Sequence, residues 1–253
     1  MSNVRYHELL PQQIVAAREA CPLAYVPLGG IEWHGEHLAV GNDALKAEVL
    51  AVRCAEARGG LAFPPLWWGE PREAYLMDAN AADRVQIDEK MGLPPENLDP
   101  GYMGRSPHET DRAYIELLVH LCRQLRSLGF RVVTLIAGHY PLRHHALAAA
   151  EWFNVSERGH AQAWGCCGYE LVRDQIPWAG DHAGRWETAL LMALRPECVD
   201  LSRLPADPNA PLIGVGTGAH HPALATAEDG EAGVQAVVAT ITARAHELLA
   251  NLP

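Results

Sequence analysis

Short, continuously apolar segments alternate along the chain with segments whose apolar residues recur at helical spacing. The apolar runs 23–28, 61–66, 131–137 and 162–167 predict buried strands. Helices are predicted over residues 11–20, 43–57, 106–128, 143–156, 185–194 and 230–249. Because strands and helices alternate, we expect an α/β fold with a mostly parallel central sheet that helices cover on both faces.

One long segment departs from this alternation. Residues 67–106 are rich in Pro, Gly, Asp and Asn and show little periodicity. A segment of this kind within a compact domain is usually functional or mobile, so we interpret it as a long insertion in a single domain spanning residues 1–253. At its end, Ser106-Pro-His-Glu109 matches a capping box with proline at the first helical position, which predicts where the next helix begins.

Composition and charge exclude several classes of partner. Apolar residues make up 49% of the 253 positions, yet no run reaches the about 18 apolar residues that a membrane span needs. The net charge of −11 disfavours a nucleic-acid backbone as partner. Residues 1–8 lack the apolar run of a signal peptide, and the six cysteines are scattered without a C-x-x-C pair. We therefore expect a cytoplasmic protein without nucleic-acid or membrane partners.

Acidic and imidazole side chains follow the predicted strands. Glu32 and His34 come after the first strand, Asp43 opens a helix, His139 follows the third strand, and Glu187 lies at the start of another helix. Carboxylate and imidazole donors without thiolates suit Zn²⁺ or Mn²⁺. In an extended segment Glu32 and His34 point to the same side and could serve adjacent ions, and Asp43 could bridge them.

Ordinary structural roles compete with this interpretation. Taken singly, Asp43 is a typical helix N-cap, His139 a hydrogen-bonded strand-end residue, and Glu187 an acid in a first helical turn. Their joint placement at the ends of strands favours a metal site. The other prominent histidines are assigned no metal role: His37, His108, His144, His145, His160, His220 and His221.

Three segments carry a resemblance to a known family. "PLGGIEWHGEHLAVGNDALKAE" (27–48) resembles the metal-binding segment of the creatininase, or creatinine amidohydrolase, family. "AGHYPLRHH" (137–145) resembles the family's N-G-H-x-x-N segment, and "DHAGRWETALLMALRP" (181–196) its H-A-G-x-x-E-T-S-x-x-L segment. The three segments occur in the family's order and span most of the chain.

The resemblance implies a three-layer α/β/α fold, a dinuclear metal centre and a homo-oligomer, usually a hexamer. It implies two Zn²⁺ ions, with Mn²⁺ as an alternative at one site. It also implies roles by position: Glu32 and His139 at one ion, His34 at the other, Asp43 as the bridge, Glu187 as an acid at or beside the second ion, and His182 as the acid–base group.

The chain also departs from the family pattern. Creatinine hydrolases carry a glutamate two residues after the position of His139, where this chain has Pro141, which offers no ligand atom. Either Glu187 takes over at the second ion, or that ion is weaker or absent. The asparagine that usually precedes Gly138 is Ala137, and the 67–106 insertion has no recognisable counterpart in the family pattern.

The candidate metal ligands predict metal-assisted hydrolysis, and the resemblance implies that a metal-bound hydroxide attacks a ring carbonyl of a small cyclic substrate. A cyclic amide is expected, with His182 and Glu187 as catalytic groups. One alternative is carbon–carbon cleavage of a cyclic 1,3-diketone or keto-inositol, and another is a non-catalytic metal-binding protein. Candidates for substrate contacts are Trp178, Trp186 and Tyr140, and, from the insertion, Asp78, Asn80, Asp83, Arg84 and Tyr102.

Overall fold

The computed structural model describes residues 3–68, 78–96, 106–157, 159–216 and 220–253. Within these residues, four strands form one parallel sheet in the order β2-β1-β3-β4. The strands are β1 (Leu23–Leu28), β2 (Leu61–Ala62), β3 (Val132–Ala137) and β4 (Gln162–Cys167). The register pairs Leu28 with Ala137 and Ala137 with Cys167, so three strands end at the same level.

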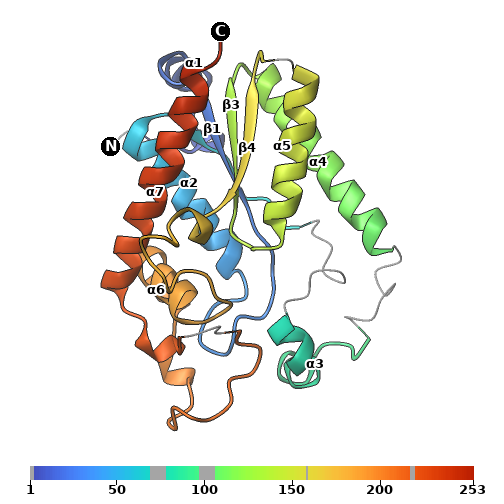
Figure 1. The fold of residues 1–253 in the computed structure, drawn as a ribbon, viewed down its shortest axis with the longest axis vertical. Helices are drawn as coiled ribbons and strands as arrows, with labels where there is room; N and C mark the ends of the chain where they lie inside the picture. The colour runs from blue at the N-terminus through green and yellow to red at the C-terminus, as the bar shows by residue number, and fades with distance from the viewer. Residues whose placement is uncertain (1–2, 69–77, 97–105, 158, 217–219) are drawn as a thin grey trace.

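Helices cover both faces of this sheet, as Figure 1 shows. On one face lie α2 (Asn42–Arg58), α6 (Arg185–Leu194) and α7 (Ala227–Ala250), and on the other lie α4 (Pro107–Ser127) and α5 (Leu142–Glu157). Side chains of β1 alternate between the two layers: Leu23 and Tyr25 pack toward α2, α6 and α7, whereas Ala24 and Val26 pack toward α4 and α5. The expected three-layer α/β/α fold is confirmed.

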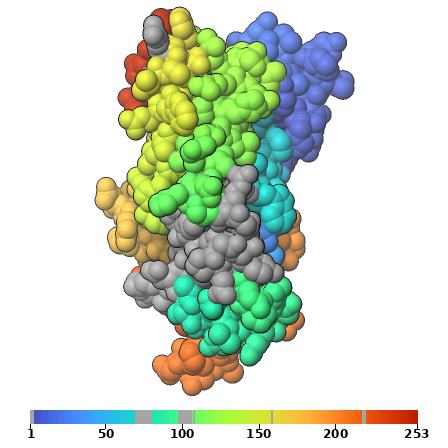
Figure 2. Space-filling view, turned by 90° about the vertical axis from the view of Figure 1, so that its right-hand side faces the viewer, coloured from blue at the N-terminus to red at the C-terminus, as the bar shows by residue number. Residues whose placement is uncertain are grey.

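The remaining helices lie outside this sandwich of layers. The helix α1 (Pro11–Ala20) precedes β1, and α3 (Asp78–Met91) lies at the end of the molecule away from the N-terminal segment (Figure 2). Five short 3-10 helices connect the main elements that the structure describes: Tyr6–Glu8, Tyr169–Leu171, Pro196–Cys198, Leu201–Arg203 and Pro222–Leu224. Among the described helices, none combines the length and apolar character that a membrane crossing requires.

Most predicted elements are confirmed, with two differences. The strand predicted over 61–66 ends at Ala62, because Pro64 and Pro65 lack the N–H that a ladder needs. Beyond Ala62, Phe63 N–H still donates to the Tyr25 carbonyl oxygen, and an isolated bridge pairs Leu66 with Leu28. The helix α3 lies within the 67–106 insertion, where the sequence predicted none. The predicted capping box is present: Ser106 N–H donates to Glu109 Oε2 at 2.9 Å, and Glu109 N–H donates back to Ser106 Oγ.

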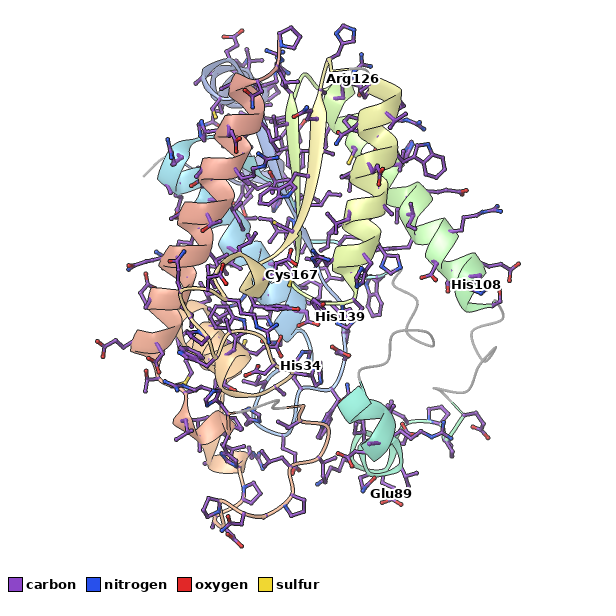
Figure 3. The ribbon with its side chains drawn as sticks, viewed as in Figure 1. His34, Glu89, His108, Arg126, His139 and Cys167 are labelled. Carbon is purple, nitrogen blue, oxygen red and sulfur yellow. The ribbon has the colours of Figure 1, made fainter. Side chains whose placement is uncertain are left out.

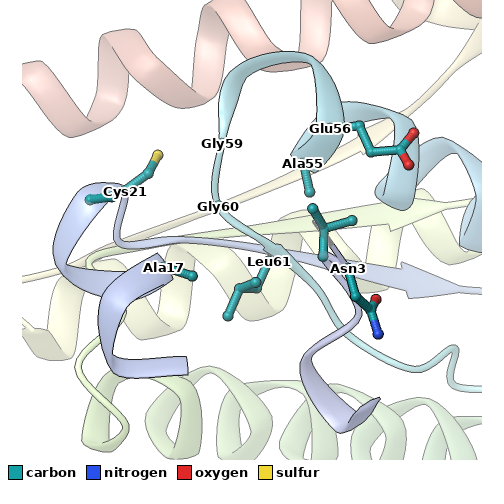
Figure 4. Close-up of a pocket in the computed structure, with 10 residues that line it drawn as sticks. Asn3, Ala17, Cys21, Ala55, Glu56, Gly59, Gly60 and Leu61 are labelled. Carbon is teal, nitrogen blue, oxygen red and sulfur yellow. The ribbon is translucent and has the colours of Figure 1, made fainter. Parts of the chain in front are cut away.

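A cavity of about 380 Å³ opens at the edge of the sheet where β1 and β2 begin, away from the carboxyl ends of β1 and β3 (Figure 4). It lies beside Cys21, which precedes β1, and Leu61, which begins β2. Its lining is mostly small and apolar, and Glu56 supplies a carboxylate at its edge. It therefore lacks the convergent polar groups of a site for hydrolysis.

Candidate metal centre

Two glycines allow α2 to begin against the ends of β1 and β3. A Cβ at Gly29 would lie 2.4 Å from the Ala44 backbone, and one at Gly138 would lie 2.0 Å from the Asp43 carbonyl oxygen. Neither distance is compatible with any larger residue unless the helix moves. The missing side chains thus bring the first turn of α2, and Asp43 with it, directly onto the strand ends.

Asp43 lies at the centre of the cluster of predicted metal ligands (Glu32, His34, Asp43, His139 and Glu187) and is fully buried. Its Oδ1 lies 3.1 Å from Nε2 of His34, and its Oδ2 lies 2.9 Å from Nδ1 of His139. The two oxygens therefore face two different histidines, an arrangement that suits a bridging carboxylate. In Figure 3, His34 and His139 mark this centre, whereas Glu89 on α3 and His108 at the start of α4 lie away from it.

The predicted ligands form two overlapping donor groups. We call Glu32, Asp43 and His139 the first group, and His34, Asp43 and Glu187 the second group; in each, the donor atoms lie within 4.8 Å of one another. Glu32 Oε1 is 2.9 Å from Nδ1 of His139, and Glu187 Oε2 is 3.5 Å from Nε2 of His34. All five residues predicted as metal ligands are thus brought together, from the segments that follow β1 and β3 and from α2 and α6.

Unpartnered atoms in the cluster fit a cation. Glu32 Oε1 and His34 Nε2 are both buried, and neither makes an aligned hydrogen bond among the described residues, although His139 Nδ1 and Asp43 Oδ1 lie nearby. In the neutral His34 ring, Nδ1 donates to the Glu32 carbonyl oxygen, so Nε2 is an acceptor, and a buried acceptor without a hydrogen bond is costly. A divalent ion bound by carboxylate and imidazole donors would satisfy both atoms.

The carboxylates also perturb the histidines. Burial alone would lower the pKa of His34, but Asp43, Glu187 and Glu32 outweigh it and raise that pKa to about 9. For His139, burial is likewise outweighed by Glu32 and Asp43, so its pKa lies well above the usual value. Burial opposes ionisation of Asp43, yet His34 and Lys46 hold its pKa well below the usual range. The three carboxylates thus give the site a negative potential, which favours protonation of the histidines and the binding of a cation.

Lys46 is a member of the site that the sequence did not reveal. It lies one helical turn after Asp43 on α2 and is buried. Its Nζ donates to Glu187 Oε1 and lies 3.4 Å from Asp43 Oδ1. A lysine on an amphipathic helix is ordinarily solvated; the available signal was its position three residues after a candidate ligand, on the same face.

The loop before α6 holds Glu187 in place. The carboxylate of Asp181 accepts hydrogen bonds from Trp186 N–H at 2.7 Å and Glu187 N–H at 3.2 Å, which fixes the start of the helix. Ala183, with φ at +55°, donates its N–H to Glu187 Oε2 at 2.8 Å. Burial, with the neighbouring Glu187, raises the pKa of Asp181 to about 7.

His182 is buried beside the two donor groups. Its Nε2 lies 3.0 Å from the Trp33 carbonyl oxygen, which can only accept, so Nε2 carries the proton of the neutral ring. Nδ1 is then unprotonated and lies 3.7 Å from Glu32 Oε1. Burial and the neighbouring His34 lower the pKa of His182. Glu32, His34 and His182 also form a third possible donor set, so this ring is placed either to ligate or to transfer protons.

The insertion reaches the site through α3. Asn80 is buried, and its Nδ2 donates to the Trp33 carbonyl oxygen at 3.2 Å and to Glu32 Oε2 at 3.4 Å. Asp83 accepts a hydrogen bond of 2.7 Å from the N–H of Gly214. Of the five polar candidates from the insertion, Asn80 thus supports a predicted ligand and Asp83 anchors α3. Tyr102 and the side chain of Asp78 lie outside the described residues.

Two histidines expected to have no special place are buried. His37 Nε2 lies 3.0 Å from Thr188 Oγ1, and burial, together with His34, lowers the pKa of His37 to about 4. His145 Nε2 lies 2.8 Å from Asp111 Oδ1, between α5 and α4. Both support packing around the site, a role that their sequence positions did not indicate.

The predicted substrate contacts are spread more widely. Trp186 is buried and meets Trp178 edge to face at 5.7 Å between ring centroids, so both rings pack in the core beside α7. A cavity of about 40 Å³, the size of a water site, lies beside the second group and is lined in part by Lys46, Tyr140, Trp186 and Glu187. Tyr140, which lines this cavity, is itself 41% exposed.

Known proteins of one family resemble this chain in sequence. The family model described as creatininase, creatinine amidohydrolase, matches residues 7–77 and 108–245. The creatinine amidohydrolase of Pseudomonas putida is 27% identical over 209 residues, covering 73% of this chain and 69% of the relative.

Solved structures show a similar fold. A manganese form of creatininase superimposes with a TM-score of 0.70 at 22% identity, covering 97% of this chain and 98% of the other. A mutant creatininase described as Zn-Zn type gives a TM-score of 0.68 at 21% identity, covering 98% of each chain.

Proposed function

Because this chain belongs to the creatininase family, we propose that it is a metal-dependent hydrolase that opens a small cyclic amide. One observation carries the proposal: the carboxylate of Asp43 is shared between two donor groups whose remaining atoms include a buried imidazole nitrogen and a buried carboxylate oxygen that make no aligned hydrogen bond among the described residues. Such an arrangement suits ions set side by side. Zinc and manganese, the metals named for the related structures, both accept these donors.

The first group would hold one ion through Glu32, Asp43 and His139, and the second group offers His34, Asp43 and Glu187 for another. When bound, such an ion acts as a Lewis acid, lowering the pKa of a coordinated water and polarising a carbonyl. The chain itself sets the orientation of these donors. Asn80 fixes Glu32, and the Ala183 N–H fixes Glu187.

His182 is proposed as the acid–base group. The hydrogen bond to the Trp33 carbonyl oxygen fixes its tautomer, leaving Nδ1 to take up and release a proton beside the donor groups. Its lowered pKa keeps the ring neutral near pH 7, so it begins as a base. The proton that Nδ1 gains from the attacking water can then pass to the leaving nitrogen of the opened ring.

We also propose that the whole chain acts as one domain in the cytoplasm, as a homo-oligomer, with a small molecule and neither nucleic acid nor membrane as partner. The described cysteines support a reducing compartment, since all six are free thiols and burial raises the pKa of those in the core, such as Cys54 and Cys166. The net charge of −11 supports the absence of a nucleic-acid partner.

The test is a substrate panel on the Zn²⁺- and Mn²⁺-loaded protein, compared with Glu32→Gln. The panel contains creatinine and other cyclic amides, cyclic 1,3-diketones and keto-inositols. Ring opening of a cyclic amide that Glu32→Gln abolishes supports the proposal. Turnover confined to the diketones or keto-inositols replaces it with carbon–carbon hydrolysis. Metal binding without turnover of any class would indicate a metal-binding protein instead.

A further inference from the structure

The ammonium of Lys46 sits against the second donor group. Its side chain is 5% exposed and forms ion pairs with Glu187 and Asp43, two of that group's three members. Among the described residues, no ion pair joins Lys46 to Glu32, the other carboxylate of the first group. A positive charge inside the protein thus already engages the second group, whereas the first group keeps Glu32, His139 and Oδ2 of Asp43.

The charges of the site favour one ion together with this ammonium. With His34 and His139 neutral, as ligation requires, Glu32, Asp43 and Glu187 supply three negative charges, which one divalent ion and Lys46 balance. Two divalent ions with Lys46 in place would leave a net charge of +2 among buried groups. Uncompensated charge is expensive to bury, so the second ion is disfavoured unless Lys46 withdraws.

Geometry points the same way. An ammonium has three donors and no acceptor, so it cannot join a coordination shell and can only compete with an ion for the carboxylates. Lys46 already engages Oε1 of Glu187 and lies near Oδ1 of Asp43, the oxygen that faces His34. Oδ2 of Asp43 faces His139 and stays available to the first group.

We propose that the Lys46 ammonium is the resident cation of the second donor group. The chain then binds one ion tightly at Glu32, Asp43 and His139, and a second ion only in competition with Lys46. This inference rests on the proposed function in one respect, that the first group is a metal site. It also accounts for Pro141. The chain lacks the family's carboxylate at that position, and Lys46 takes the place of the ion that this carboxylate would bind.

The first experiment counts ions. The parent, Lys46→Met and Lys90→Met are loaded with excess Zn²⁺ or Mn²⁺ and passed through gel filtration. Retained metal is then measured by inductively coupled plasma mass spectrometry. The parent is expected to retain one equivalent, and Lys46→Met to retain two, or to bind the second at least about tenfold more tightly by calorimetry. Two equivalents retained equally by the parent and Lys46→Met would overturn the inference.

Two controls separate charge from folding. Lys90 is the chain's other lysine and pairs with Glu36 at the surface, so Lys90→Met should retain metal as the parent does. Lys46→Arg keeps the positive charge and should retain one equivalent, whereas two equivalents in this variant would argue against charge competition. Circular dichroism shows whether Lys46→Met remains folded; if it does not, the Lys46→Arg result and the spectroscopic experiment below decide.

The second experiment observes the lysine directly. With only two lysines, protein labelled with ¹⁵N-lysine gives two Nζ resonances, assigned by Lys46→Arg and Lys90→Met. The Lys46 signal should keep its ion-paired character through the first equivalent of Zn²⁺ and change only as further metal displaces it. A complete change during the first equivalent would overturn the inference. Absence of any bound metal would instead refute the proposed function itself, which keeps the two failures distinct.

Discussion

Oδ2 of Asp43 lies 2.9 Å from Nδ1 of His139, although 96 residues separate them in the chain. Asp43 lies in the first turn of α2, which follows β1, and His139 follows β3. They meet because β1 and β3 end at the same level of the sheet. The following predictions depend on that arrangement.

Asp43→Asn should be the most damaging ligand change. An amide has a single acceptor oxygen, so it cannot serve both donor groups. The substitution also removes the negative charge that attracts the metal ions. We expect a loss of metal affinity beyond the about 10–100-fold that changes around a ligand cause. Calorimetric titration with Zn²⁺ measures it, with Asp207→Asn as an exposed control. Affinity equal to that of the parent would remove Asp43 from the centre.

His182→Ala should retain metal and lose turnover. The residue acts through its Nδ1 proton, and a positioned acid–base group contributes about 10²–10⁴-fold to the rate. The exposed His108→Ala serves as the control and should behave as the parent. If His182→Ala loses metal in step with activity, His182 is a ligand, as its place beside Glu32 and His34 also allows.

Metal affinity should rise with pH. His139 is a donor of the first group, where the tightly bound ion is expected, and Glu32 and Asp43 outweigh burial and raise its pKa well above the usual value, so an ion must displace a proton from this ring before it can ligate. Affinity should therefore increase as the pH rises above about 6.5, by up to about tenfold per unit for each proton released. Calorimetry at pH 7 in buffers of different ionisation enthalpy counts the protons. A binding enthalpy independent of the buffer would contradict the prediction.

Gly138→Ala should displace α2. Its Cβ would overlap the Asp43 carbonyl oxygen at 2.0 Å, a backbone atom that cannot turn aside. Overpacking of this kind costs about 1–3 kcal/mol or more, and here it also moves a ligand. We expect a lower melting temperature and weaker metal binding together. Gly168→Ala meets only Val237 side-chain atoms at 3.3 and 3.6 Å and should change neither. An unchanged melting temperature for Gly138→Ala would show that α2 can yield at no cost.

Asp83→Ala should loosen α3 without disturbing the sheet. The hydrogen bond from Gly214 N–H to this carboxylate ties α3 to the loop before residue 217. A hydrogen bond to a charged group contributes about 1.5 kcal/mol or more, so exchange of the Gly214 amide should accelerate roughly tenfold. Hydrogen-exchange mass spectrometry measures this, with the exposed Glu89→Ala on the same helix for comparison. Equal protection in both variants would show that α3 is held by other contacts.

Much of this architecture follows from the order of residues. Buried runs such as 23–28 and 131–137 permit little besides strands, and a parallel sheet places whatever follows them at one edge. For that reason the amino-acid sequence alone is enough to group Glu32, His34, Asp43, His139 and Glu187 as candidate ligands. The segment resemblance added His182 as the acid–base group.

Other features depend on tertiary contacts that a local pattern does not encode. Lys46 has the ordinary sequence context of a solvated helix residue and is buried only because α6 brings Glu187 over it. Asn80 and Asp83 anchor the helix α3 through hydrogen bonds to distant loops. His37 and His145 owe their burial to partners on other helices. Each case is decided by a partner far away in the chain.

The common register of β1 and β3 has a consequence for how the protein reaches its native state. A slip of one residue between these strands would move His139 by about 3.3 Å and turn the side chains of β3 to the opposite face. A misregistered sheet could pack apolar residues but could not assemble Glu32, Asp43 and His139 around one ion. Metal binding would therefore selectively stabilise chains whose strands have paired in the correct register.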